Sequence, residues 1–396
     1  MLNSSVLKSA YHSILRYNKR MPNYVALHQI HNSSLSSLPP NRAKVDQAKP
    51  APEIKPEIPG LSDKERLQQD IQKIKDKRGT FISWNDFAEL TKFKLSVLNT
   101  TVAAVAYFMT TKCVWTDFLS TSLFLMGTQL SAMSSQAMNQ GIEYEQDMKM
   151  KRTSARPVPL GKFTPNQAKA LSWGLLGLAN CLLLPNFGWE SAAVANAIFA
   201  SYVYIYTPMK RTSTSNTHWG SLVGALVPYL GWMAGGGSFL SLSPLMMTLF
   251  IFSWQYPHFY GILWTYKEDY RKGGFKMIED PVRAGTHVKL AFGGYMVSLL
   301  GLAYTGAINP FLTVPSLYWF YKYGWKPGVE FQKNPTVENA KKMKYGSYVP
   351  FTLFFGLLIL GLAQKVYMEE FHLGKLKKEE ENNVVEDKQN AAENAQ

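Results

Sequence analysis

Nine apolar runs, separated by short polar stretches, constrain this chain more than any other feature of its sequence. A helix needs about 20 apolar residues to cross a bilayer, and most of the runs come close to that length. They lie at about residues 95–113, 117–138, 168–187, 190–207, 219–237, 240–262, 289–308, 310–323 and 348–368. Backbone polar groups in lipid must be satisfied within the segment, which favours helices. The sequence therefore predicts an all-α fold, a polytopic membrane bundle of about nine transmembrane helices.

The charged residues between the runs support this count. Lys and Arg gather before the first run and in the loops after the second, fourth, sixth and eighth runs, whereas the other loops carry almost no charge. Membrane proteins keep such basic loops on one side of the bilayer. We therefore expect the basic loops on the matrix or cytoplasmic face and the C-terminus opposite. The formal net charge of +14 then reflects topology and anion binding, and no nucleic-acid partner is predicted.

Composition divides the chain into four regions. Residues 1–45 contain several Lys and Arg but no Asp or Glu, which is typical of a mitochondrial transit peptide; an ordinary disordered segment is the alternative. Residues 46–84 combine a Pro-rich linker with a charged surface helix over about 61–78. Residues 85–368 form the predicted transmembrane domain. The polar residues 369–396 are predicted to be a disordered tail.

A first polar cluster stands where the second run ends. Asn139, Glu143 and Asp147 follow one another at four-residue steps, which puts them on one face of a helix. Two carboxylates and an amide oxygen suit Mg²⁺, which commonly takes one or two carboxylates together with substrate phosphate oxygens. Acids at the end of a membrane helix are also often simply solvated, and Glu145 lies off the shared face. The four-residue spacing favours a magnesium site at Asn139, Glu143 and Asp147.

Basic side chains follow this cluster and also the fourth run. Arg152 and Arg156 come directly after the acids, and Lys210 and Arg211 come directly after Tyr206. Arginine is suited to bidentate hydrogen bonding of phosphate oxygens. These four cations are candidate ligands of a diphosphate, and Tyr206 is a candidate contact of the phosphate or of a carbocation.

The sixth run contains polar groups at an unusual depth. Trp254, Gln255 and His258 stand within it, and polar groups inside an apolar run are costly enough to suggest a site. A lone histidine is more often a hydrogen-bonded core residue. Pro257 is expected to kink or break the helix.

The loop after the sixth run supplies one more acid and one more cation. Asp269 should leave its helix on the same basic face as Asp147, so it is the candidate second metal-binding acid. Lys276, further along the same loop, is a further candidate diphosphate ligand.

Three strings carry a resemblance: NQGIEYEQDMKMKRTSARP, YTPMKRTSTSNTHWGSLVGALVPYLGW, and SWQYPHF followed by EDY. Over about residues 85–330 the chain resembles the intramembrane UbiA-type prenyltransferases, and within them the protoheme IX farnesyltransferase (heme O synthase) branch. That family has nine helices and two acidic motifs that bind an isoprenoid diphosphate through Mg²⁺. Many members carry Asp where Glu143 stands. The second motif here has Glu268 and Asp269 in place of two Asp spaced by three, which leaves a second metal open.

The resemblance implies a reaction and a set of partners. Farnesyl diphosphate would alkylate a vinyl group of heme B to give heme O, with Mg²⁺ as cofactor and heme B as a substrate. The lipid bilayer and a downstream heme A synthase are the other implied partners, and the implied location is the mitochondrial inner membrane with the active face toward the matrix. The implied catalytic set is Asn139, Glu143, Asp147, Arg152 and Asp269; the implied metal ligands are Asn139, Glu143, Asp147 and Asp269; and the implied substrate-binding residues are Arg156, Tyr206, Lys210, Arg211, Trp254, Gln255, His258 and Lys276.

Three other functions stay open on the sequence alone. A prenyltransferase acting on 4-hydroxybenzoate would share the diphosphate chemistry, although the WQYPHF string disfavours it. A transporter would need acids near the membrane midplane and an inverted repeat, whereas the acids here stand at the ends of runs. A structural assembly protein would have no need of Asn139, Asp147, Arg152 and Asp269.

Overall fold

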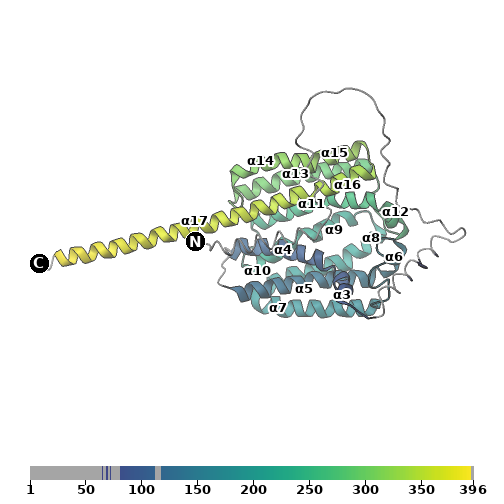
Figure 1. Cartoon of the computed structure of the whole chain (residues 1–396), viewed down its shortest axis with the longest axis horizontal. Helices are drawn as coiled ribbons and strands as arrows, with labels where there is room; N and C mark the ends of the chain where they lie inside the picture. The colour runs from purple at the N-terminus through teal and green to yellow at the C-terminus, as the bar shows by residue number, and fades with distance from the viewer. Residues whose placement is uncertain (1–64, 66–67, 70–71, 73–80, 112–116, 394–396) are drawn as a thin grey trace, which may run out of the picture. The chain divides into compact units, whose positions relative to one another are not determined.

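The computed structural model describes residues 81–111 and 117–393, together with residues 65, 68–69 and 72. The predicted transit peptide, the Pro-rich linker and most of the predicted surface helix lie outside these residues. The described residues form helices and no strand (Figure 1), so the predicted all-α fold is confirmed. The helices are α3 (Trp84–Leu90), α4 (Phe93–Thr111), α5 (Phe118–Ile142), α6 (Tyr144–Lys149), α7 (Pro165–Ala200), α8 (Thr207–Thr212), α9 (Asn216–Ala225), α10 (Val227–Ala234), α11 (Leu242–Thr265), α12 (Lys267–Lys272), α13 (Pro281–Tyr304), α14 (Pro310–Phe320), α15 (Lys326–Lys333), α16 (Val337–Gly346) and α17 (Tyr348–Glu393), with π-helical turns η2 (Ser201–Tyr206) and η3 (Tyr321–Trp325).

Each predicted apolar run overlaps a helix, and the third and fourth runs share α7. Gly188 separates these two runs inside α7, with φ of +79°, a left-handed conformation that glycine adopts without a side-chain clash. By length and hydropathy, two stretches of the described residues qualify as membrane-crossing helices, Pro165–Thr212 and Val337–Phe371. The structure thus places a helix at every predicted run, while the number of membrane crossings stays a prediction.

The start of α7 shows how local sequence sets a helix boundary. Thr164 accepts a hydrogen bond from the backbone N–H of Gln167, and the Gln167 side chain accepts one in return from the backbone N–H of Thr164. This capping box satisfies two backbone donors at once. Pro165 occupies the first helical position, where no backbone N–H is needed.

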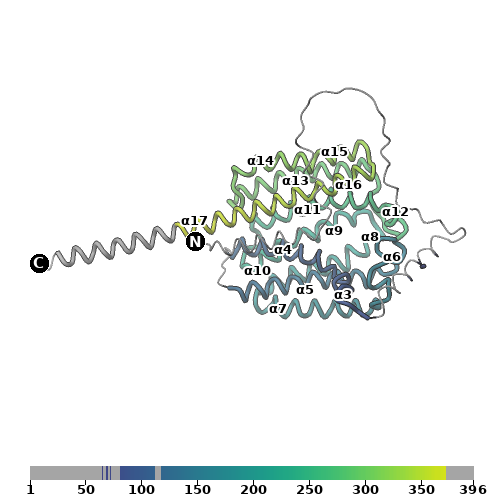
Figure 2. The backbone as a smooth tube through the Cα atoms, viewed as in Figure 1, coloured from purple at the N-terminus to yellow at the C-terminus, as the bar shows by residue number. Residues whose placement is uncertain are grey.

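The long helices pack side by side in pairs. α5 lies along α7, α11 along α13, and α4 along α10 (Figure 2). Buried aromatic rings fill the space between them, among them Phe250 stacked on Phe354 and Tyr107 stacked on Phe124. The short helices α6, α8 and α12 gather at one end of the bundle (Figure 1). The loops that hold the predicted acids and bases therefore meet at that end.

Two expectations differ from the structure. α11 continues through Pro257 without interruption, because neighbouring groups in a helical bundle can satisfy the carbonyl that proline leaves without a donor. α17 continues as helix to Glu393, where the sequence predicted a disordered tail from residue 369. That tail is rich in Glu and Lys, which are good helix formers, and it extends a helix that has already begun.

Candidate functional site

Asn139, Glu143 and Asp147 form a ladder of polar side chains at the end of the second run. This ladder keeps its predicted four-residue spacing in the structure. α5 ends at Ile142, and Glu143 connects it to α6. Although regular helix is interrupted there, the backbone N–H of Glu143 donates to the carbonyl of Asn139 at 2.9 Å, and that of Asp147 donates to the carbonyl of Glu143 at 2.9 Å. Successive turns of this kind hold the three side chains one above another. The side chains of all three are buried.

Asp147 is the most enclosed of these acids. It is fully buried, and both of its carboxylate oxygens accept hydrogen bonds from Nη1 of Arg156 at 2.7 Å. The loop after α6 folds back to bring Arg156 there, since the Thr153 hydroxyl donates to the carbonyl of Asp147 at 3.1 Å and the Arg156 backbone N–H donates to Thr153. The predicted acid and the predicted cation are thus in direct contact.

Glu143 forms a second buried ion pair, with a residue far along the chain. Nζ of Lys210 lies 2.8 Å from Oε1 and 3.0 Å from Oε2 of Glu143. The same ammonium sits 4.5 Å from the centre of the Tyr206 ring. η2 comes directly before α8, which carries Lys210, and π-helical turns of this kind are often found at functional sites. The structure therefore brings Glu143, Lys210 and Tyr206 together.

Asn139 is tied to the same segment. Its Nδ2 donates to the hydroxyl of Thr207 at 3.3 Å, and that hydroxyl donates in turn to the carbonyl of Tyr202. With its amide nitrogen committed, the amide oxygen of Asn139 is the atom left for a cation. The ladder and the η2–α8 segment consequently form one polar unit.

Asp269 and Arg152 meet at the edge of this unit. The backbone N–H of Arg152 donates to Oδ2 of Asp269 at 3.1 Å, and the Arg152 guanidinium lies 5.0 Å from the Tyr266 ring centre and 5.5 Å from that of Tyr270. α6 and α12 are in contact. Asp269 therefore borders the loop that carries Arg156 and is partly exposed.

Lys276 and Arg211 lie further out. Both side chains are exposed. The backbone of Lys276 is nevertheless fixed, because its N–H donates to the carbonyl of Lys210 at 2.8 Å and its carbonyl accepts from Asn216 at 2.7 Å. These two bonds fasten the loop between α12 and α13 onto α8 and α9.

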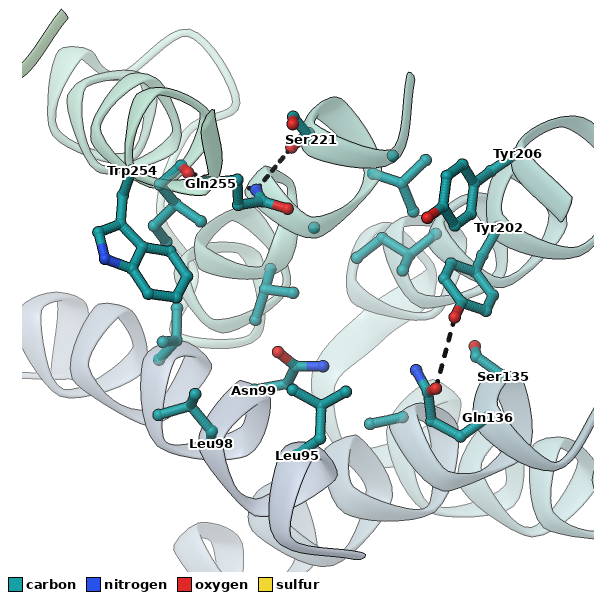
Figure 3. Close-up of a pocket in the computed structure, with 18 of the residues that line it drawn as sticks. Leu95, Leu98, Asn99, Ser135, Gln136, Tyr202, Tyr206, Ser221, Trp254 and Gln255 are labelled. Carbon is teal, nitrogen blue, oxygen red and sulfur yellow. Dashed lines mark hydrogen bonds between the residues drawn. The ribbon is translucent and has the colours of Figure 1, made fainter. Parts of the chain in front are cut away.

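An apolar cavity of about 410 Å³ adjoins the polar unit. Trp254 and Gln255 stand on one wall and Tyr202 and Tyr206 on the facing wall (Figure 3). His258 also lines it. Its volume falls in the range of small-molecule sites, and apolar side chains from α4, α10 and α11 form much of the remainder.

Trp254 and His258 are held by the start of the last helix. The indole N–H of Trp254 donates to the carbonyl of Ser347 at 2.7 Å, and Nδ1 of His258 lies 3.4 Å from the Ser347 hydroxyl. The two rings stack, with centres 4.8 Å apart. His258 therefore has a local structural partner as well as a place on the cavity wall.

Gln255 is positioned by the glycine-rich helix opposite. Its Nε2 donates to the carbonyl of Ser221 at 2.8 Å. A Cβ atom at Gly224 would stand 2.7 Å from Oε1 of Gln255, and one at Gly220 would stand 2.5 Å from the Tyr206 ring. The small residues of α9 thus give room to two side chains that line the cavity.

The oxygen donors of the ladder fit Mg²⁺. Two carboxylates and the amide oxygen of Asn139 are hard ligands of the kind this ion takes. In the described part of the chain, no three His, Cys, Asp or Glu side chains form a group able to hold a metal by themselves. A Mg²⁺ ion at Asn139, Glu143 and Asp147 would therefore need substrate oxygens as well.

Three further residues face this site that the sequence did not single out. Lys92 donates to Oε1 of Gln136 at 2.9 Å, and the Tyr202 hydroxyl donates to the same oxygen at 3.4 Å. Desolvation lowers the pKa of Lys92 to about 7, and the charges of Arg156 and Lys210 act in the same direction. In the sequence Lys92 is one of many basic residues beside an apolar run, and its spacing gives no sign of this contact.

The chain is similar in sequence to known prenyltransferases. A model of the UbiA prenyltransferase family matches residues 97–366. The chain is 32% identical over 292 residues to a protoheme IX farnesyltransferase of Opitutus terrae, covering 70% of this chain and 94% of that protein. It is 31% identical over 278 residues to the mitochondrial protoheme IX farnesyltransferase of Arabidopsis thaliana, covering 69% of this chain and 64% of that protein.

Solved structures share the fold at low sequence identity. A digeranylgeranylglyceryl phosphate synthase superposes with a TM-score of 0.57 at 16% identity, covering 71% of this chain and 98% of that one. A UbiA homologue from Archaeoglobus fulgidus bound to DMAPP and Mg²⁺ superposes with a TM-score of 0.51 at 12% identity, covering 70% and 99%. The family match extends over most of the helical bundle, and the chain belongs to the UbiA prenyltransferase family.

Proposed function

We propose that this protein transfers the farnesyl group of farnesyl diphosphate to a vinyl group of heme B, giving heme O. Membership of the prenyltransferase family and the names of its relatives support the reaction class and the acceptor. The observation that carries the diphosphate half is two ion pairs of buried carboxylates, Asp147 with Arg156 and Glu143 with Lys210, beside an apolar cavity. The diphosphate of the substrate would lie beside these cations, and its apolar prenyl tail would lie in the cavity.

The polar end is the end of the bundle where α6, α8 and α12 gather (Figure 1). In this proposal its cations bind the diphosphate leaving group. The bond between C1 of the prenyl chain and the diphosphate oxygen breaks, and its electron pair goes to that oxygen. Arg156 and Lys210 would share their hydrogen bonds between the carboxylates and the diphosphate, which stabilises the charge as it develops. A Mg²⁺ ion bound by Asn139, Glu143 and Asp147 together with diphosphate oxygens would supply further charge neutralisation.

The cavity would hold the apolar partners of the reaction. The allylic C1 forms a bond to the terminal vinyl carbon, and water adds a hydroxyl to the neighbouring carbon with release of a proton. Trp254, Gln255 and His258 would face the acceptor, and the ring of Tyr206 would lie between the tail and the ammonium of Lys210. Enclosure by apolar walls would keep water from the cation until the new carbon–carbon bond is made.

We place the protein in the mitochondrial inner membrane with the polar end toward the matrix. Two kinds of observation support this: relatives from Arabidopsis thaliana and Yarrowia lipolytica are named as mitochondrial, and the basic loops share one side of the predicted topology. Asp269 is the proposed second metal-binding acid, at the edge of the site.

The test is product analysis on purified full-length protein in nanodiscs. The protein receives heme B, farnesyl diphosphate and Mg²⁺, and heme O is quantified by chromatography with mass detection. Heme O from the wild type, with a loss of about 10³-fold in Asp147→Asn, is the expected result. Glu145→Gln is the matched control, since Glu145 is an exposed acid on α6 that lies off the ladder. Prenylation of 4-hydroxybenzoate in place of heme B would overturn the proposed acceptor, and the absence of any prenylated product would overturn the enzyme.

A further inference from the structure

Lys92 stands between two cavities, of which one is lined by several charged side chains and the other is not. It lines a cavity of about 890 Å³ together with the cations Arg152 and Arg156 and the acids Asp86 and Glu89. Its ammonium donates to Gln136 at 2.9 Å, and Gln136 lines the apolar cavity of about 410 Å³. The ammonium therefore marks the boundary between a space that holds charged side chains and an apolar one. A prenyl diphosphate has one such boundary, at the bond between C1 and the diphosphate oxygen.

The backbone at Lys92 is held in an uncommon conformation. Its φ is +44°, and the left-handed region costs a residue with a side chain roughly 1–2 kcal/mol. Lys92 separates α3 from α4, and its carbonyl accepts from the N–H groups of Leu95 and Ser96 at 2.8 and 3.0 Å. Strain of this size persists only where the surroundings impose it.

α5 provides those surroundings. Gln140 donates to the carbonyls of Glu89 and Leu90 at 2.7 and 2.9 Å, which fixes the chain just before Lys92. Gln136, one turn earlier on α5, accepts from the Lys92 ammonium. The helix that carries Asn139 at its end thus also sets the place of Lys92, so the lysine is fixed relative to the ladder.

Charge balance leaves Lys92 available to an anionic substrate. Glu143 and Asp147 already pair with Lys210 and Arg156. Over residues 81–111 and 117–393, Lys92 takes part in no ion pair, and the contact of its ammonium is with a neutral amide. Arg156 and Lys210 lie close enough to lower its pKa, while Asp147 and Glu143 oppose that shift more weakly. An arriving anion would find this lysine without a carboxylate in an ion pair and would stabilise its protonated form.

We propose that Lys92 is a substrate-binding residue that donates a hydrogen bond to the diphosphate at its prenyl end, on the oxygen that leaves C1. This deepens the proposed function and rests on it. In the step itself, the electron pair of the breaking C1–O bond goes to that oxygen, and the Lys92 N–H stabilises the charge that appears there. Gln136 acts through Lys92 as a positioning residue.

The test measures binding rather than turnover. Full-length wild type, Lys92→Met, Lys92→Arg and the control Lys149→Met are placed in nanodiscs with Mg²⁺, and farnesyl thiodiphosphate, a slowly ionising analogue, is titrated calorimetrically. Lys149 is an exposed cation in the last turn of α6 that lines neither cavity. We expect Lys92→Met to weaken binding about ten- to a hundredfold, as loss of a charged hydrogen bond does. Lys149→Met should match the wild type, and Lys92→Arg should retain most of the affinity.

The pH dependence separates a binding role from a purely structural one. A lysine with a pKa near 7 in the free protein must take up a proton to bind an anion at higher pH, so wild-type affinity should fall relative to Lys92→Arg between about pH 6.5 and 8.5. The arginine stays charged throughout. Wild-type affinity in a folded Lys92→Met would overturn the inference. If Lys92→Met does not fold, an unchanged ratio of wild-type to Lys92→Arg affinity across this pH range would overturn it. A wild type that binds no farnesyl thiodiphosphate would overturn the proposed function as a whole.

Discussion

The polar end and the apolar cavity of this bundle are built in different ways. At the polar end, buried carboxylates meet basic side chains in ion pairs, such as Asp147 with Arg156 nine residues later. Around the cavity, side chains are held by backbone carbonyls of distant helices, such as Trp254 by Ser347, 93 residues later. One region is organised by charge and the other by close packing. Substitutions in the two regions should therefore impair the protein in different ways.

Burial makes the charges of the polar end costly to separate. Removing one member of a buried pair leaves the other uncompensated, which costs about 3–5 kcal/mol. Around the cavity, the close packing of helices is what a substitution would disturb. A Cβ atom at Gly231 of α10 would overlap the carbonyl oxygen of Ala103 on α4. The polar end depends on keeping its charges and the cavity on keeping its spacing.

The largest expected effect is on Lys210. Lys210→Met should lower the rate of heme O formation about 10³-fold, because it removes a cation from the proposed leaving-group site and leaves Glu143 buried without its partner. Heme B binding, followed by absorbance titration, should be unchanged, since the proposed acceptor site is the cavity and not the polar end. The matched control is Lys149→Met, an exposed lysine in the last turn of α6. A variant that lost heme B binding as strongly as turnover would show that the two regions are not separable.

The next effect is on packing at Gly231. Gly231→Ala should destabilise the protein by about 3 kcal/mol, since α10 cannot keep its distance from α4 with a methyl group pressed on a backbone carbonyl. Thermal unfolding in detergent measures it. Gly177→Ala is the control, because a Cβ atom at Gly177 would meet nothing within 4 Å. Equal unfolding temperatures for the two variants would contradict the tight α4–α10 contact.

A smaller effect is expected at the cavity wall. Trp254→Phe keeps an aromatic ring beside His258 but loses the hydrogen bond to Ser347, worth about 1 kcal/mol. The KM for heme B should rise about fivefold, while the KM for farnesyl diphosphate stays the same. Trp173→Phe, on the exposed face of α7, is the control. A change in the KM for farnesyl diphosphate alone would place Trp254 beside the other substrate.

The same contrast explains what the sequence could predict. Asn139, Glu143 and Asp147 follow helical spacing, so their shared face could be inferred from the sequence alone, and Arg156 lies close enough along the chain to be included. The sequence singles out both Lys210 and Glu143, but it does not predict their pairing, which spans 67 residues. Lys92 could not be found at all, because its place depends on a left-handed backbone and on two glutamines of α5. Periodicity carries information along one helix, whereas contacts between helices depend on packing that the pattern does not specify.

The smallest effect concerns an exposed charge cluster beside the polar end. Glu279 lies 3.1 Å from Nε of Arg271 and 3.3 Å from Nζ of Lys267, and the hydrogen bond from Arg271 holds the pKa of this carboxyl below its usual range. Its stabilising effect is therefore present above the ordinary pKa of glutamate and is lost as the pH falls through the lowered value. Because solvent screens these groups, the effect should be about 0.5 kcal/mol. Wild type should unfold slightly above Glu279→Gln at about pH 7 and at the same temperature at about pH 3, with the exposed Glu190→Gln as control. A difference as large as that expected for the buried pairs would mean that exposure does not separate the two kinds of ion pair in this protein.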